Sequence, residues 1–138
     1  MSVDRTYPFD EDLLDDVNWL GEVLGIGERY MITVFMLSLA VGVRENCPRQ
    51  GSHKKSNRGP RTGLKDQEFA LMQSVVSAVS STSDLEPGTD DFVATICSYA
   101  NGGLMQIRAQ LKDMREPRAA LVAYLEQLAD ETEGSIGQ

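Results

Sequence analysis

Apolar residues recur at helical spacing along most of the chain, and this spacing divides it into segments. Between 10 and 24 they return every three or four positions, which predicts a first helix with one apolar face and Asp10 as its N-cap. Between 28 and 43 they cover nearly the whole circumference, which is typical of a helix buried inside the fold or at an interface. Because this second segment is rich in β-branched residues, a strand is the alternative. The apolar positions of the first segment are Leu13, Leu14, Val17, Leu20 and Leu24.

The rest of the chain predicts further helices. Segment 66–80 has an apolar face typical of a third helix, and Thr89 or Asp90 caps a fourth. The pattern resumes between 104 and 111, and Pro117 suits the first turn of a last helix. Residues 131–138 are expected to be a flexible tail. The sequence therefore predicts a single all-α domain over 1–138, a compact bundle of five or six helices, with no strand hairpin indicated.

Two adjacent glycines, Gly102 and Gly103, lie inside a pattern that otherwise indicates one helix. A glycine within a helix costs roughly 1 kcal/mol relative to alanine, so a pair needs a structural reason. Either the helix ends here, with Asn101 and Gly102 as a C-cap pair, or another backbone comes very close. A further hypothesis makes this stretch a flat surface on which a partner docks. That surface would consist of Tyr99, Asn101, Gly102, Gly103 and Met105.

Composition places the chain among ordinary globular proteins. Its 138 residues are 41% hydrophobic and 25% charged, which suits one domain with a substantial core. The net charge of −8 should repel nucleic acid and anionic membranes at long range. The longest apolar run, 30–43, is shorter than the roughly 20 residues of a membrane span. Cys47 and Cys97 lie far apart without paired spacing, which suits a reducing compartment, so a cytoplasmic location is expected.

The charge is unevenly distributed along the chain. Residues 44–65 hold seven basic residues and one acid, and they are rich in Gly, Ser, Asn and Pro, so we expect a long exposed basic loop. It is interpreted as a solvated segment, as a contact for the phosphates of DNA or RNA, or as a contact for an acidic partner or a neighbouring copy's acidic helix. Without aromatic residues, the loop offers no stacking platform for bases. The basic residues are Arg44, Arg49, Lys54, Lys55, Arg58, Arg61 and Lys65.

Acidic residues crowd the first quarter of the chain. Acids near the start of a helix favour the positive end of its dipole, so a solvated acidic face is one interpretation. The sharper hypothesis is a docking surface for a basic partner, such as a DNA-handling subunit. The residues are Asp4, Asp10, Glu11, Asp12, Asp15, Asp16, Glu22 and Glu28.

Candidate catalytic and metal residues do not form a recognisable set. His53 is the only histidine, and together with Cys47 in a basic loop it does not make a zinc site. A Ser-His pair would need an ordered pocket and an acid to orient the imidazole. The Gly25-Ile-Gly27 turn lacks the lysine and third glycine of a phosphate-binding loop. We therefore predict no metal site, no cofactor and no enzymatic activity.

One stretch of the last third resembles a known family. Tyr99-Ala-Asn-Gly-Gly-Leu104, a helix over 105–111 and a proline-initiated helix over 117–128 resemble the Dnd system-associated protein four family. Segment 35–44, an apolar helix that closes on a glycine and a basic residue, is a looser match. Members of that family are encoded beside DNA phosphorothioation genes, which mark host DNA with sulfur and restrict unmarked phage DNA. The resemblance implies a setting in phage defence and carries over no catalytic residues.

These observations lead to two hypotheses of function. The first is a non-catalytic helical adaptor or accessory subunit of a bacterial phage-defence or DNA-modification assembly, which docks other protein subunits. The alternative is a small nucleic-acid-binding subunit that contacts phosphates through the basic loop at 44–65. No membrane partner is expected, and assembly of several copies stays open.

Overall fold

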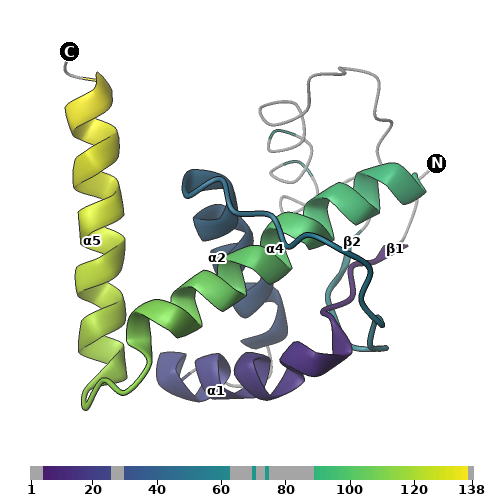
Figure 1. The fold of residues 1–138 in the computed structure, drawn as a ribbon, viewed down its shortest axis with the longest axis horizontal. Helices are drawn as coiled ribbons and strands as arrows, with labels where there is room; N and C mark the ends of the chain where they lie inside the picture. Colours follow the sequence, from purple (N-terminus) through teal and green to yellow (C-terminus); the bar gives the residue numbers. More distant parts are fainter. Residues whose placement is uncertain (1–4, 26–29, 63–69, 71–73, 75–88, 137–138) are drawn as a thin grey trace.

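The computed structural model describes residues 5–25, 30–62, 70, 74 and 89–136. These residues are mostly helical, which confirms the all-α class, but they contain four α-helices instead of five or six. The predicted helix over 66–80 lies outside the described residues, apart from two isolated positions. In chain order the elements are β1 (Arg5–Thr6), η1 (Glu11–Leu13), α1 (Leu14–Leu24), α2 (Tyr30–Arg44), β2 (Arg61–Thr62), α4 (Asp90–Leu111) and α5 (Pro117–Ile136) (Figure 1).

The crossing of α2 and α4 forms the centre of the fold, and α1 packs across both helices (Figure 1). Phe35 and Leu39 of α2 and Ile96 and Leu104 of α4 are almost completely buried there. The N-terminal segment closes the core from another side, because Phe9 packs edge-on against Phe35 with ring centroids 5.3 Å apart. Apolar burial of this kind is the main favourable term in folding, so the α2–α4 crossing holds the molecule together.

The glycine pair lies inside one uninterrupted helix, α4, so the predicted C-cap at Asn101 and Gly102 is wrong. The alternative, close approach of another backbone, is confirmed. A Cβ built on Gly103 would overlap the Ser38 carbonyl of α2, and a Cβ on Gly42 would overlap the Tyr99 carbonyl of α4. The merging of two predicted helices into α4 also explains part of the lower helix count. The N-cap of α4 is Thr89, as predicted, and its Oγ1 accepts a hydrogen bond from the Phe92 backbone N–H at 3.3 Å.

Residues 45–60, which we call the strap, lie across α4 and the N-terminal segment and are tied to both. The Arg49 N–H donates to the Ser98 carbonyl at 2.8 Å, and the Ser98 hydroxyl donates to the Arg49 carbonyl at 3.0 Å. The Ser56 N–H donates to the Phe9 carbonyl at 3.0 Å, and the strap runs into β2, which pairs with β1 in an antiparallel arrangement. Residues 45–60 form no helix and half of them are exposed, while several of their backbone groups find hydrogen-bond partners within the chain.

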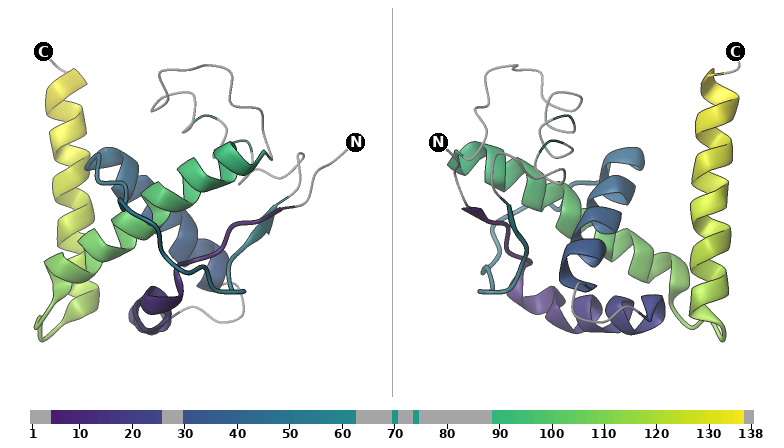
Figure 2. Two further views of the ribbon diagram at one scale, coloured as in Figure 1. Left: turned by 45° about the vertical axis from the view of Figure 1, so that its right-hand side comes forward. Right: turned by 180° about the vertical axis from the view of Figure 1, so that it is seen from behind.

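The last helix, α5, stands beside the rest of the molecule and packs lightly on α4 and α1. Leu121, Tyr124 and Leu128 are buried, while the Arg118 Nε donates to the Val23 carbonyl at 2.9 Å. The helix continues to Ile136, so the tail predicted from residue 131 is helical up to that point. Its last turns extend past the end of α2 in each view (Figure 2). Among the described helices, none has the length and apolar character that would let it cross a membrane.

Candidate protein-docking surface

A buried carboxylate, Asp10, joins the acidic and the basic parts of the chain. Its side chain is 1% exposed. One carboxylate oxygen accepts a hydrogen bond from Arg49 Nη1 at 2.7 Å, and the other accepts one from Lys55 Nζ at 2.6 Å. We call Asp10, Asp12, Arg49, Lys55 and Asn101 the charge clasp. Two cations on one buried carboxylate satisfy the condition under which a buried charge is tolerated.

Asn101 holds the backbone of the charge clasp in place. Its Oδ1 accepts a hydrogen bond from the Asp10 N–H at 2.9 Å, while its Nδ2 donates to the Cys97 carbonyl at 2.7 Å. Asp10 was predicted as the N-cap of the first helix, and it does occupy the N-cap position. Asp10 does precede η1, but its side chain makes no capping hydrogen bond. Its carboxylate binds the two strap cations instead.

Arg49 also binds Asp12 through both of its terminal nitrogens, at 2.9 and 2.7 Å. This bidentate geometry is among the stronger forms of carboxylate recognition. The hydrogen bonds from Arg49 hold the pKa of Asp12 below its ordinary value. The same bonds, with Asp12 contributing most, raise the pKa of the Arg49 guanidinium further above its ordinary value. Arg49 is therefore a fixed cation, and its side chain is only 12% exposed.

The charge clasp takes up part of the basic patch predicted to bind phosphates or an acidic partner. Arg49 and Lys55 bind this chain's own acids, and Lys54 lies 3.3 Å from Glu11 as an exposed pair. Arg44 is exposed at the end of α2, and Arg58 is half-buried. The side chains of Arg61 and Lys65 lie outside the described residues. An acidic surface does meet the basic segment, but it belongs to the same molecule.

Asp10, Asp12 and His53 come close enough together to raise the question of a metal ion. Their ligand atoms all lie within 4.8 Å of one another, a grouping that sequence reasoning missed. The donor set does not fit a cation, because Arg49 and Lys55 already contact the Asp10 oxygens and Arg49 holds Asp12. A metal ion would have to displace two positive side chains from a buried carboxylate.

Most of the docking surface predicted around the glycine pair is interior. Asn101, Gly102 and Gly103 are buried, and the strap covers Gly102 so closely that a Cβ there would overlap the Cys47 carbonyl. These three positions therefore cannot form an exposed face. Tyr99 is half-buried, and Met105 is 43% exposed.

Met105 and Gly102 line a hollow of about 560 Å³ beside the strap. Its other walls are mixed in character, with Arg49, His53 and Gln106 contributing polar groups. Cys47 also lines it, but burial raises the pKa of this thiol, so the hollow holds no activated cysteine. Met105 stays a candidate contact at the edge of this hollow.

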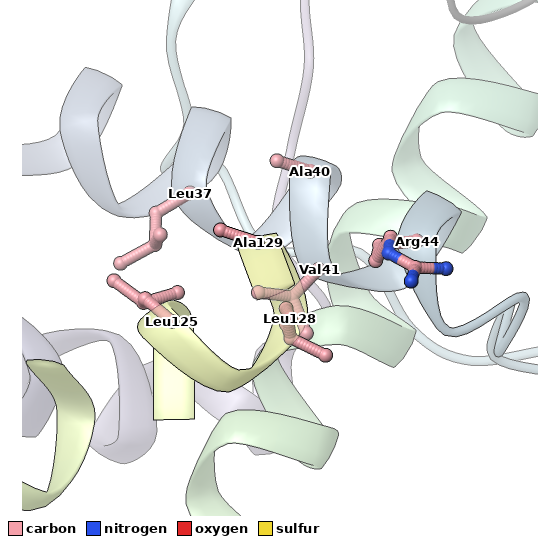
Figure 3. A pocket seen from close by; sticks show the side chains of 7 residues that line it. All are labelled: Leu37, Ala40, Val41, Arg44, Leu125, Leu128 and Ala129. Atoms are coloured by element: carbon pink, nitrogen blue, oxygen red, sulfur yellow. The ribbon is translucent and has the colours of Figure 1, made fainter. Parts of the chain in front are cut away.

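A second, almost purely apolar surface lies between α2 and α5, and sequence reasoning did not find it. We call this surface the α2–α5 groove; it has a volume of about 190 Å³. Leu37 of α2 and Leu125 of α5 point toward each other across it, and Arg44 lies at one end with its guanidinium turned away (Figure 3). The lining residues are Leu37, Ala40, Val41, Arg44, Leu125, Leu128 and Ala129.

The groove exists because α2 has more apolar surface than its neighbours in the described part of the chain cover. Val34 and Phe35 of α2 are buried, whereas Leu37 remains half-buried and Ala40 is exposed. On α5, Ala129 is exposed and adds no bulk, which leaves the hollow open. The apolar circumference of 28–43 was the sequence signal for this surface, since it predicts burial in the fold or at an interface.

Comparisons with protein-family models, with curated proteins and with solved structures find no match. The family resemblance of the last third therefore stays a prediction.

Proposed function

We propose that this protein is a non-catalytic helical adaptor whose docking face is the α2–α5 groove. The observation that carries the proposal is an apolar, open groove built from two helices, with six apolar side chains and one cation at its end. Contiguous exposed apolar surface on a small protein is typical of sites where another protein binds. Grooves between helices in particular accept an apolar helix face.

The charge clasp supports a structural role for the charged residues rather than a catalytic one. Asp10 and Arg49 are mutually paired, and each of their short hydrogen bonds is intramolecular. A catalytic acid or base needs access to a substrate proton at hydrogen-bond distance. Asp10, at 1% exposure with two cations on its carboxylate, is poorly suited to that task.

The partners proposed here are other protein subunits in a bacterial cytoplasm. The resemblance of the Tyr99–Leu104 stretch to the Dnd-associated family gives the proposal its setting, a phage-defence or DNA-modification assembly. The alternative, a nucleic-acid-binding subunit, has less support, because Arg49 and Lys55 neutralise acids of the same chain. Nucleic-acid affinity depends on how many cations can neutralise phosphates.

Replacement of two exposed alanines on α5 by glutamate, one at a time, tests the proposal. Ala129 lines the groove and Ala123 does not, yet both are exposed and lie six residues apart on one helix. In cells that naturally produce the protein, a tagged wild-type chain and an Ala123→Glu variant should recover the same companion subunits. Ala129→Glu should lose them, because it places a charge in the apolar groove.

Two results would contradict the adaptor proposal. One is equal recovery of companion subunits by Ala129→Glu and Ala123→Glu. The other is retention of the purified protein on duplex or single-stranded DNA at low ionic strength, with loss of binding in a Lys54→Ser, Arg58→Ser variant. That second result would favour the nucleic-acid alternative.

A further inference from the structure

We infer that the strap is a latch, which opens as one unit while the helices stay folded, and that the charge clasp holds it shut. The inference goes beyond the adaptor proposal and does not depend on it, because no strap residue lines the α2–α5 groove. Two features of the strap carry it. Its attachments to the rest of the chain are mainly polar, and a hollow lies on each side of its contact with α4.

The strap contributes almost nothing to the hydrophobic core. Of its residues only Pro60, where the strap joins β2, is buried, and none belongs to the core that the described residues form. That core consists of side chains from the N-terminal segment, from η1 and from α1, α2, α4 and α5. Apolar burial is the main favourable term in folding, so the core can stay folded when the strap leaves.

The strap meets α4 between two hollows. One has a volume of about 560 Å³ and reaches toward the end of α4, where Met105 and Ala109 line it. The other has a volume of about 360 Å³ and reaches toward the start of the helix, where Ala94 and Ser98 line it. Between them, Arg49 and Ser98 exchange two hydrogen bonds, at 2.8 and 3.0 Å. Segments with so few packed contacts are the ones that open locally in native proteins.

The charge clasp supplies the strongest of the ties that hold the strap shut. Arg49 and Lys55 bind Asp10, and Arg49 also binds Asp12, through charge-assisted hydrogen bonds of 2.6–2.9 Å. All of them join the strap to the N-terminal segment and η1, so they break without the loss of any contact between helices. In the open form both cations and both acids reach water, which recovers the desolvation cost of the closed clasp.

The closed strap masks a face of α4 and two cations at once. It covers Gly102 so closely that a Cβ there would overlap the Cys47 carbonyl. The acids of the clasp meanwhile neutralise Arg49 and Lys55. Opening therefore uncovers the glycine face and releases both cations in a single step, so the latch controls when either becomes accessible.

Native-state hydrogen exchange of the full chain, resolved by residue with NMR, tests whether the strap opens as a unit. The backbone amides of Arg49 and Ser56 donate from the strap to the rest of the chain, and those of Phe9 and Glu11 donate to strap carbonyls. All four should exchange with one common opening free energy, below that of global unfolding. Four unrelated values would mean that the strap frays piecemeal, and they would overturn the inference.

The neighbouring amide of Asp10 is a built-in control. It donates to Asn101 of α4 and not to the strap, so it should exchange more slowly than the amides of Phe9 and Glu11 on either side of it. Exchange of Asp10 at their rate would show that the N-terminal segment leaves together with the strap, which contradicts a latch.

A variant in the core separates local from global opening. Ile107→Val removes one methyl group from a fully buried side chain, so core amides of α4 should exchange up to about tenfold faster. The strap amides of Arg49 and Ser56 should keep their wild-type rates, because the core is intact in the open form. Equal acceleration of strap and core amides would show that the strap leaves only when the whole molecule unfolds, and it would overturn the inference.

Two adjacent lysines test whether the clasp is what holds the strap. Lys55→Ala removes a hydrogen bond to the buried carboxylate, so the strap amides should exchange at least about tenfold faster. Lys54→Ala removes only an exposed pair with Glu11, so the same amides should accelerate no more than about threefold. Equal effects of the two substitutions would overturn the role of the clasp as the latch.

Discussion

The charge clasp and the α2–α5 groove differ in whether the chain satisfies its own chemistry. In the clasp, cations of the strap and acids of the N-terminal segment meet within 2.6–2.7 Å of one another, and Asp10 is 1% exposed. In the groove, apolar side chains of α2 and α5 line a hollow of about 190 Å³ that the described residues leave open. The charged groups of the clasp bind one another within one chain, whereas no described residue covers the apolar lining of the groove.

A binding surface is therefore expected where side chains lack partners within the described part of the chain. Segregated charges in a sequence are expected to attract charged partners, but here the opposite charges of the clasp pair across 37 to 45 positions of the same chain. The apolar lining of the groove, by contrast, has no partner among the residues that the structure describes. The comparison predicts that damage to the clasp lowers stability, whereas damage to the groove lowers binding.

Removal of the clasp carboxylate should have the largest effect on stability. Asp10→Ala leaves Arg49, which is 12% exposed, without one of its two acids and deprives Lys55 of its partner. We expect the free energy of unfolding to fall by about 3 kcal/mol, as for other broken buried pairs. Glu11→Ala, which removes the exposed pair with Lys54, should cost less than about 0.5 kcal/mol. Urea unfolding of both variants measures the difference, and similar losses would mean that the clasp is no more than a surface ion pair.

Substitution of Gly103 at the α2–α4 crossing should have the second-largest effect on stability. Gly103→Ala places a Cβ against the Ser38 carbonyl, so the helices must move apart at a cost of about 2–3 kcal/mol. Helix propensity alone would give the opposite sign, a gain of roughly 1 kcal/mol. Gln110→Ala, at an exposed position of the same helix, should change stability by less than about 0.5 kcal/mol. Thermal or urea unfolding decides the sign, and a more stable Gly103→Ala would refute the close crossing.

Ser38→Ala should raise stability slightly. The Ser38 hydroxyl is completely buried and has no hydrogen-bond partner among the described residues. Alanine removes this unsatisfied group and fits the same space, so we expect a gain of up to about 1 kcal/mol. Equilibrium unfolding measures it, and a clear loss of stability would indicate that the hydroxyl has a partner in solution.

The smallest expected effect is the pH dependence that Asp12 contributes. Its pKa is lower in the folded chain than its ordinary value of 3.8, mainly through the hydrogen bonds from Arg49. The stability that ionised Asp12 contributes is therefore present above its ordinary pKa of 3.8 and is lost as the pH falls through the lower pKa of the folded chain. Because the Asp12 side chain is exposed, this contribution to the free energy of unfolding should be less than about 1 kcal/mol. Asp12→Asn should flatten the decline in stability below pH 4, and an unchanged acid limb would contradict the pairing.

The sequence predicted the helices better than the contacts between distant segments. The apolar faces around Val17 and Phe35 repeat at helical spacing, so local pattern was enough to locate α1 and α2. The merger of two predicted helices into α4 depends on Gly103 meeting Ser38, which are 65 positions apart. The pairing of Asp10 with Lys55 likewise depends on the path of the strap. The groove depends on where α5 stands, which no local pattern specifies.

We propose that the groove serves binding and not folding, and Ala129→Glu separates these two roles. Its unfolding free energy and its recovery of bound subunits should be measured on the same preparation, beside Ala123→Glu. We predict that both variants unfold within about 0.5 kcal/mol of the wild type and that Ala129→Glu alone loses the bound subunits. Full recovery of those subunits by a normally folded Ala129→Glu protein would show that the groove is not the docking face.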